Sequence, residues 1–179
     1  QPIEAAWLNV WKNIGLPDPK RYFLAEANPF LPNRLIVREN SSQQELPKRL
    51  IHRAGLRIWH LQDASFQSPK ANVFIAVDSE HAVRSPYHIA MTRLMVELLL
   101  DHLNEFTYSA EIAGLNYNVY AHQGGFTFHL SGFSCRIYRL LELLLKNRTG
   151  GYYEPARFYA VKEQLIRNWR NQNKNRPIA

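Results

Sequence analysis

The sequence predicts an α+β fold, in which helices pack on one face of a mixed, mainly antiparallel sheet. Three observations support this fold class. In five short segments, apolar residues alternate with polar ones or run without interruption, which is typical of strands. In longer segments they recur at helical intervals, and the resulting order β-β-β-α-β-β-α-α is typical of a two-layer sandwich. Finally, 46% of the 179 residues are hydrophobic, which is enough for one domain with a sizeable core.

The N-terminal part combines a helical pattern with a proline-rich segment. Residues 3–13 place Trp7 and Trp11 on one side of a predicted amphipathic helix. Residues 16–33 contain four prolines, and each proline removes a backbone donor and disfavours helix in the residue before it. We therefore expect this second segment to be an extended connector.

Three strands are predicted next. Residues 40–48 are polar and are expected to form a loop. Strands follow at 48–53 and 56–62, and Ala54-Gly55 between them suits a turn or bulge. Residues 71–77 form a continuous apolar run, so we expect this strand to be central in the sheet.

Three helices are predicted in the rest of the chain. Ser85-Pro86 supplies an N-cap and a proline in the first turn, which together mark the start of a long helix. This helix is expected to run to about Glu111 and to end at Gly114. Two further helices are predicted at 136–147 and 155–173, with a glycine-containing break between them.

A β-hairpin is predicted between the first and second of these helices. Gly124-Gly125 separates two segments of strand character and suits a two-residue turn. That turn would place Ala121 opposite Phe128 and Val119 opposite Leu130. The predicted register is self-consistent because apolar side chains face apolar side chains across the two strands.

Composition excludes disulfides and a four-cysteine zinc site, and it shows an uneven distribution of charge. Cys135 is the single cysteine, so the chain has neither an internal disulfide nor a four-cysteine zinc site. No run of eighteen apolar residues is present, so we expect no membrane-spanning segment. The formal charge of +7 is concentrated at one end: residues 136–179 hold 10 basic and 3 acidic side chains, whereas residues 1–135 hold 12 of each.

The predicted long helix contains most of an inverted zinc-protease motif. In H-x-x-E-H, two histidines four positions apart bind the metal, the glutamate activates water, and a third ligand comes from elsewhere. His102 and Glu105 match this pattern, but Phe106 stands where the second histidine is needed. A phenyl ring has no lone pair to donate. The motif is therefore degenerate, and we expect no catalytic residue and no metal ligand here.

Both polar residues of the degenerate motif also have a structural interpretation. His102 is in line with Met91, Met95 and Leu98, so we expect it in the core. Glu105 is in line with a charged face of the helix that carries oppositely charged neighbours four positions apart, as solvated helical faces do. Further residues of that face are Arg93, Glu97 and Asp101.

The other histidines give weaker hypotheses. His122 and His129 are expected to be diagonal neighbours on one face of the hairpin, within reach of a shared metal ion. The simpler interpretation is that they are polar positions on a hydrated sheet face. The remaining histidines show no ligand spacing: His52, His60, His81 and His88.

Two further constellations can be proposed from residue types alone. Ser85, His88 and Asp101 could form a serine-hydrolase triad, but no G-x-S-x-G turn supports it. The segment 78–81 mixes carboxylates with an imidazole, and we expect it to have a capping or solvated role on a loop after a strand. The sequence contains neither a phosphate-binding loop nor a G-x-G-x-x-G motif.

Several separated motifs are shared with a known family. They are N-P-F-x-P at 28–32, a strand pair with Trp59, Asp63, Phe66 and Pro69-Lys70, the Leu-Asn-Glu-Phe helix at 103–106, an Ala113-Gly114 helix exit, and the helix at 157–171. In this order, and over nearly the whole chain, they resemble the pitrilysin and insulin-degrading enzyme (insulinase) family of inverted zinc metallopeptidases. The match is to the third of that family's four homologous domains, which lacks the zinc ligands.

The resemblance implies how the chain is organised and what it does. Residues 1–33 would be a helix and connector from the preceding domain, and residues 34–179 an inactive peptidase-homology domain that continues past Ala179. The parent would be a zinc metalloendopeptidase that carries its zinc in the first domain. This chain would then be no enzyme by itself and would hold no cofactor. Its partners would be the remaining domains of the same polypeptide and peptide substrates, and its role would be chamber wall and substrate binding.

Alternatives from other classes remain open at this point. The basic residues after position 135 could bind nucleic acid or another polyanion, although a solvated helical face or a chamber wall that attracts acidic peptides is the simpler account. An independent zinc hydrolase could use His122, His129 and a carboxylate. The family includes both periplasmic and cytoplasmic members, so the resemblance does not decide the compartment.

Overall fold

The computed structural model describes residues 3–15, 26–37, 45–63, 65–147, 154–172 and 174. Its elements are α1 (Ala5–Asn13), β1 (Lys48–Arg53), β2 (Leu56–His60), β3 (Lys70–Asp78), α2 (Glu80–Val83), α3 (Pro86–Ile112), β4 (Asn116–His122), β5 (Gly125–Phe133), α4 (Ile137–Asn147) and α5 (Pro155–Gln172). Most of the predicted 16–33 connector, most of the 40–48 loop and the break before α5 lie outside the described residues. None of the described helices combines the length and apolarity needed to cross a bilayer.

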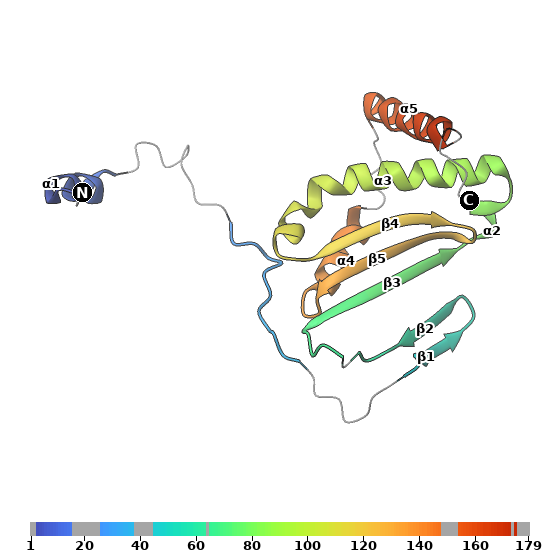
Figure 1. Cartoon of the computed structure of the whole chain (residues 1–179), viewed down its shortest axis with the longest axis horizontal. Coiled ribbons are helices and arrows are strands. Elements are labelled where there is room, and N and C mark those ends of the chain that lie inside the picture. The colour runs from blue at the N-terminus through green and yellow to red at the C-terminus, as the bar shows by residue number, and fades with distance from the viewer. Residues whose placement is uncertain are drawn as a thin grey trace.

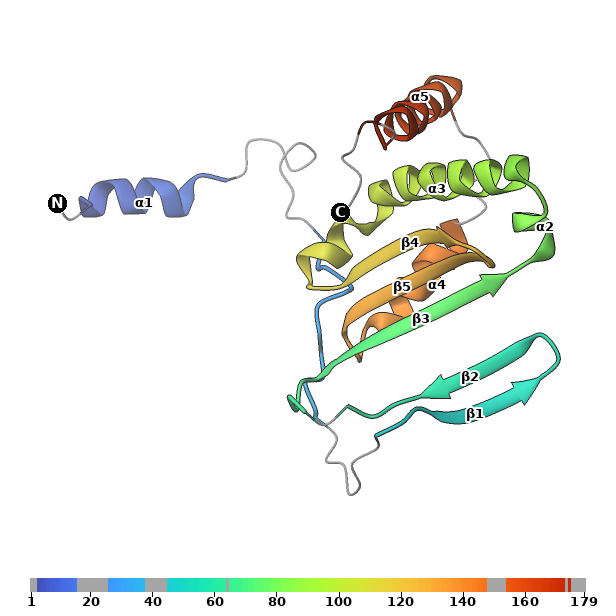
Figure 2. The same cartoon turned by 45° about the vertical axis from the view of Figure 1, so that its right-hand side comes forward.

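The core lies between a three-stranded antiparallel sheet and two helices that cover one of its faces. The strand order in this sheet is β3-β5-β4. Leu103 of α3, Leu130 of β5 and Leu140 of α4 are fully buried and belong to one apolar cluster. Figures 1 and 2 show α3 and α4 against this sheet and α5 outside α3. The predicted α+β fold class is confirmed.

The predicted sheet differs from the observed one in its strand order. β5 is the central strand and β3 lies at an edge, so the prediction of a central strand at 71–77 is wrong. Phe74 and Ala76 are apolar but exposed, whereas Ala71, Val73 and Ile75 pack against the core. The run is therefore continuous because an aromatic residue occupies the open face, not because both faces are buried.

The first two strands form a sheet of their own. β1 pairs with β2 in an antiparallel hairpin, and the hydrogen-bonded order does not join it to β3. Nearly all of its side chains are exposed, including Leu50, Ile58 and Trp59. Both views place this hairpin beside the free edge of β3 (Figures 1 and 2).

The β4-β5 hairpin has a register two residues away from the predicted one. Val119 pairs with Phe128, and His122 pairs with Gly125, so the turn is at positions 123–124. Gly125 belongs to the strand through its pairing with His122 and Asp78, and a Cβ at this position would collide with the Val77 backbone carbonyl of β3. A shift by two residues keeps every side chain on its predicted face.

The proline-rich connector is fixed to the helices where it is described. Phe30 is buried in the core, and the Asn28 side-chain amide donates to the Ser109 carbonyl over 2.6 Å. The Arg136 guanidinium donates to the Leu31 carbonyl over 2.8 Å. The N-P-F-x-P segment therefore packs with the unit that follows it, while the proposed boundary at residue 33 stays a prediction.

Candidate functional site

Helix α3 positions the degenerate zinc motif. The helix begins as predicted, with the Ser85 hydroxyl accepting a hydrogen bond from the His88 backbone amide and Pro86 in the first turn. It ends at Ile112, and Gly114 follows with φ of 77°, a conformation that favours glycine. The motif therefore lies on a continuous helix, where side chains four positions apart are neighbours.

His102 and Phe106 lie side by side on this helix. Their ring centroids are 5.1 Å apart and the rings are inclined by 65°. The Phe106 side chain is 38% exposed, and Glu105 beside it is exposed as well. The phenyl ring therefore occupies the neighbouring position from which a second imidazole would have to donate.

His102 is not a core residue, so that part of the sequence prediction is wrong. It is partly exposed, whereas Leu103 next to it is fully buried. The buried residues Leu99, Leu103, Thr107 and Ala110 follow one another at three- and four-residue intervals, so the buried side of this half of the helix is centred about 100° away from His102. Met91, at the start of the predicted stripe, is exposed as well.

A small polar network follows the motif along α3 and was missed in the sequence. Thr107 is fully buried and its hydroxyl donates to the Tyr117 hydroxyl over 3.4 Å, and Tyr117 donates in turn to the Asn104 side chain over 3.2 Å. Burial raises the pKa of Tyr117, and the nearby Glu111 carboxylate adds to the rise while the Thr107 hydrogen bond opposes it. No local sequence pattern predicts this network, because its members come from both α3 and β4.

The two hairpin histidines are held by different partners. The His129 Nε2 lies 3.1 Å from the Asn72 Oδ1, whereas the His122 Nδ1 accepts from the Gly124 amide over 3.0 Å. The observed register puts the two histidines on the same face but not in diagonal positions, so that expectation is wrong. Within the described ranges, no group of three or more His, Cys, Asp or Glu side chains lies close enough to hold a metal ion.

The structure brings together two members of the hypothetical triad but not the third. The Ser85 Oγ and the His88 Nδ1 are 2.8 Å apart because both belong to the N-terminal cap of α3. Asp101 lies more than three turns further along the same helix and forms an ion pair with Arg157 at 3.1 Å. The contact between the serine and the histidine is therefore explained by capping.

The predicted loop at 78–81 is also corrected, since Glu80 begins the short helix α2.

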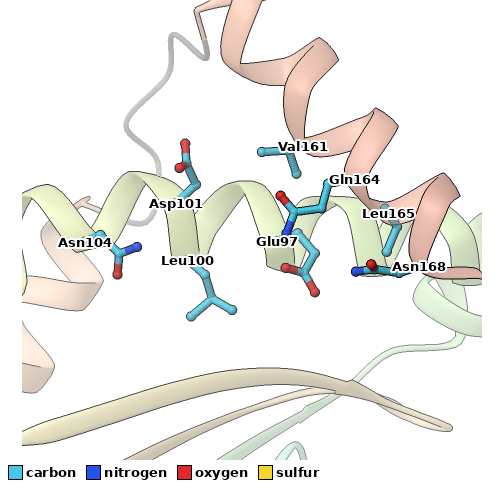
Figure 3. Close-up of a pocket in the computed structure, with 8 residues that line it drawn as sticks. All are labelled: Glu97, Leu100, Asp101, Asn104, Val161, Gln164, Leu165 and Asn168. Carbon is cyan, nitrogen blue, oxygen red and sulfur yellow. The ribbon is translucent and has the colours of Figure 1, made fainter.

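A shallow pocket lies between α3 and α5. Its cavity is about 220 Å³, which is below the usual range of small-molecule sites, roughly 300–1,000 Å³. Figure 3 shows side chains of both helices around it: Glu97, Leu100, Asp101, Asn104, Val161, Gln164, Leu165 and Asn168. The pocket is an incomplete packing contact, because no side chain of α5 is fully buried.

Some of the C-terminal basic residues have structural roles. Arg136 and Arg139 donate to backbone carbonyls of the connector, and Arg157 pairs with Asp101. These three cations hold elements together within the chain. The polyanion-binding alternative stays a hypothesis, because these contacts involve only three of the ten basic residues after position 135.

Comparison with known proteins shows where the chain fits. A family model described as the middle or third domain of peptidase_M16 matches residues 1–179. The peroxisomal insulin-degrading enzyme-like 1 of Arabidopsis thaliana is 30% identical over 154 residues, which cover 86% of this chain and 16% of that protein. The insulin-degrading enzyme of Drosophila melanogaster is 31% identical over 168 residues, which cover 93% of this chain and 17% of that protein. The chain thus spans about one sixth of these relatives.

A solved structure has the same fold. The crystal structure of pitrilysin superposes with a TM-score of 0.71 and 21% sequence identity, over 84% of this chain and 16% of that chain.

Proposed function

Because the chain belongs to the M16 peptidase family, as a middle or third domain, we propose that it is a non-catalytic domain of a zinc metalloendopeptidase. In this proposal it contributes to the wall of the substrate chamber and helps to bind peptide substrates. The zinc would be held by the first domain of the longer polypeptide, and the other domains of that polypeptide would be its permanent partners.

One observation carries the proposal. Phe106 takes the position beside His102 from which a second imidazole would have to coordinate the metal. Catalytic zinc sites use three protein ligands and keep a fourth position open for water or substrate. Within the described ranges, no group of three or more His, Cys, Asp or Glu side chains that could hold a metal includes His102, and in this proposal hydrolysis is carried out by another domain.

The test uses the purified 179-residue chain. We expect far less than one zinc per chain by plasma mass spectrometry after equilibration with zinc and gel filtration. We also expect no cleavage of a fluorogenic peptide, but measurable peptide binding by calorimetry. Stoichiometric zinc that disappears in a His102→Ala variant, together with cleavage, would overturn the proposal. An H-x-x-E-H motif encoded ahead of Gln1 would support the assignment of zinc to another domain.

A further inference from the structure

The tip of the β4-β5 hairpin meets the end of β3 and the start of α2. His122 and Asp78 are the last residues of β4 and β3, and both pair with Gly125 of β5. The Ser79 backbone amide donates to the Gly124 carbonyl over 2.9 Å. Ser79 is also the residue that precedes α2. The hairpin turn and the start of α2 are therefore joined by a backbone hydrogen bond.

The imidazole of His122 holds this turn from one side. Its Nδ1 accepts a hydrogen bond from the Gly124 backbone amide over 3.0 Å. The spacing is that of an Asx-turn, in which a side-chain acceptor binds the backbone amide two residues further on. A ring nitrogen accepts only while it carries no proton, so the neutral ring must hold its proton on Nε2.

The second ring nitrogen of His122 has no hydrogen bond. Its Nε2 is buried and lacks a hydrogen-bond partner among the described residues. The Asp78 Oδ1 lies 4.0 Å from this nitrogen, which is too far for a hydrogen bond. The Asp78 side chain is 73% exposed, so a change of rotamer can bring its carboxylate closer. A donor and a carboxylate thus face each other without being joined.

The other charges around His122 are few. The ring lines a cavity of about 190 Å³, to which α2 contributes Ala82 and Val83. Arg93 of α3 is the charged side chain among the remaining described lining residues, and it would repel a positively charged ring. The titratable residues of α2, Glu80 and His81, are not among the lining residues. Asp78 is therefore the anion that a protonated His122 would meet.

We propose that His122 is a pH-sensitive switch in the hairpin turn. Imidazole is the side chain that ordinarily changes its charge between pH 5 and 8. When Nδ1 takes up a proton it becomes a donor, faces the Gly124 amide and loses that hydrogen bond. The positively charged ring then forms an ion pair with Asp78 through Nε2. Protonation thus exchanges a hydrogen bond within the turn for an ion pair with the end of β3.

The exchange changes the turn and the start of α2 together. Once the Gly124 amide has lost its acceptor, the Gly124 carbonyl is held less firmly for the Ser79 amide. The β3-β5 ladder does not involve the imidazole, so the sheet itself keeps its pairing. The inference concerns local order at one corner of the domain, and it does not depend on the proposed function.

The experiment is a nuclear magnetic resonance titration of the ¹⁵N-labelled 179-residue chain between pH 8 and 5. At pH 8 the ring nitrogens of His122 should show a proton on Nε2 and none on Nδ1. As the ring becomes protonated, the Gly124 amide and the Asp78 carboxylate signals should move with the same midpoint. The exchange protection of the Gly124 and Ser79 amides, relative to the intrinsic rate at each pH, should fall about three- to tenfold, as expected for one lost hydrogen bond.

Two matched variants assign the response to one ring. His122→Asn keeps an acceptor for the Gly124 amide but cannot be protonated in this range. It should therefore retain the protection of Gly124 at pH 8 and abolish its dependence on pH. His81→Asn removes an exposed histidine of α2 and should leave the response unchanged. Circular dichroism at both pH values checks that each variant is folded.

Three results would overturn the inference. The first is a proton on Nδ1 of His122 at pH 8. The second is a Gly124 amide whose protection is the same at pH 8 and pH 5. The third is a Gly124 response that persists in His122→Asn or disappears in His81→Asn, because another titrating group would then be its source.

Discussion

At the scale of single residues, Phe106 limits metal binding by the degenerate motif on α3. It lies beside His102 with 5.1 Å between ring centroids, and both side chains are accessible. The second imidazole of the inverted motif is therefore missing, and this missing ligand, not the helix itself, sets the limit on metal binding.

A Phe106→His variant tests this limit. We expect it to bind zinc or cobalt weakly, in the micromolar range, because two imidazoles four positions apart can share one metal. It should still fail to cleave peptides, since the third protein ligand is lacking among the described residues. Calorimetry and cobalt absorption measure the binding, and Phe106→Ala is the matched control. Metal binding equal in both variants would contradict the expectation.

Tyr117 predicts a change in stability at alkaline pH. Burial raises its pKa above the usual value of about 10, so the folded state holds this proton more tightly than the unfolded state. The corresponding stability is present below the unfolded pKa and is lost as pH rises through the folded pKa. Urea unfolding between pH 9 and 12 should show this loss, and Tyr117→Phe should reduce it. An identical pH profile in the variant would count against the assignment.

At the scale of elements, two adjacent glycines have different roles. A Cβ on Gly125 would meet the Val77 carbonyl, which is fixed by the β3-β5 ladder. A Cβ on Gly124 would meet the end of the exposed Asp78 side chain, which can move away. The central strand therefore depends on glycine at position 125 and much less on glycine at position 124.

We expect Gly125→Ala to lower the free energy of unfolding by about 2 kcal/mol or more, through backbone strain and lost pairing. Gly124→Ala should cost clearly less and serves as the matched control. Denaturant unfolding followed by circular dichroism gives both values. Equal losses would show that the strand tolerates a side chain at position 125 as well as the turn does at position 124.

The same elements show what local sequence can and cannot predict. Capping residues predicted the start of α3 because Ser85 and Pro86 act within one turn. The order of the strands was not predictable in this way, because the exposed Phe74 made an edge strand look buried on both faces. Likewise, the hairpin register depends on the approach of β3 to Gly125, which lies far away in the sequence.

The degenerate motif itself could be recognised from residue types. The exposure of His102 could not be recognised in this way, because it depends on which side of α3 faces the sheet. The network around Tyr117 could not be recognised either, because Tyr117 belongs to strand β4.

At the scale of the whole molecule, the described part of the chain exposes several large apolar side chains. Among them are Trp7 and Trp11 in α1, a helix without a buried residue, and Trp59 in β2. Large exposed apolar patches often mark surfaces that contact another protein or domain. These residues support the proposal that other domains of a longer polypeptide cover parts of this chain.

The β1-β2 hairpin should be the least protected described part of the sheet structure. A two-stranded hairpin is marginal in water, and this one has neither a third strand nor a buried face. In hydrogen exchange at neutral pH, amides of 48–60 should exchange much faster than those of β5. Comparable protection in both segments would indicate that the hairpin is held by partners the strand order does not show.

The buried side and the accessible side of helix α3 have different roles. Leu103, Thr107 and Ala110 point into the interior and maintain the architecture, while His102, Glu105 and Phe106 are at least partly accessible. Substitutions on the outward side therefore carry little penalty for folding. In a polypeptide with several related domains, one copy can lose its chemistry over evolutionary time and still be retained for its shape.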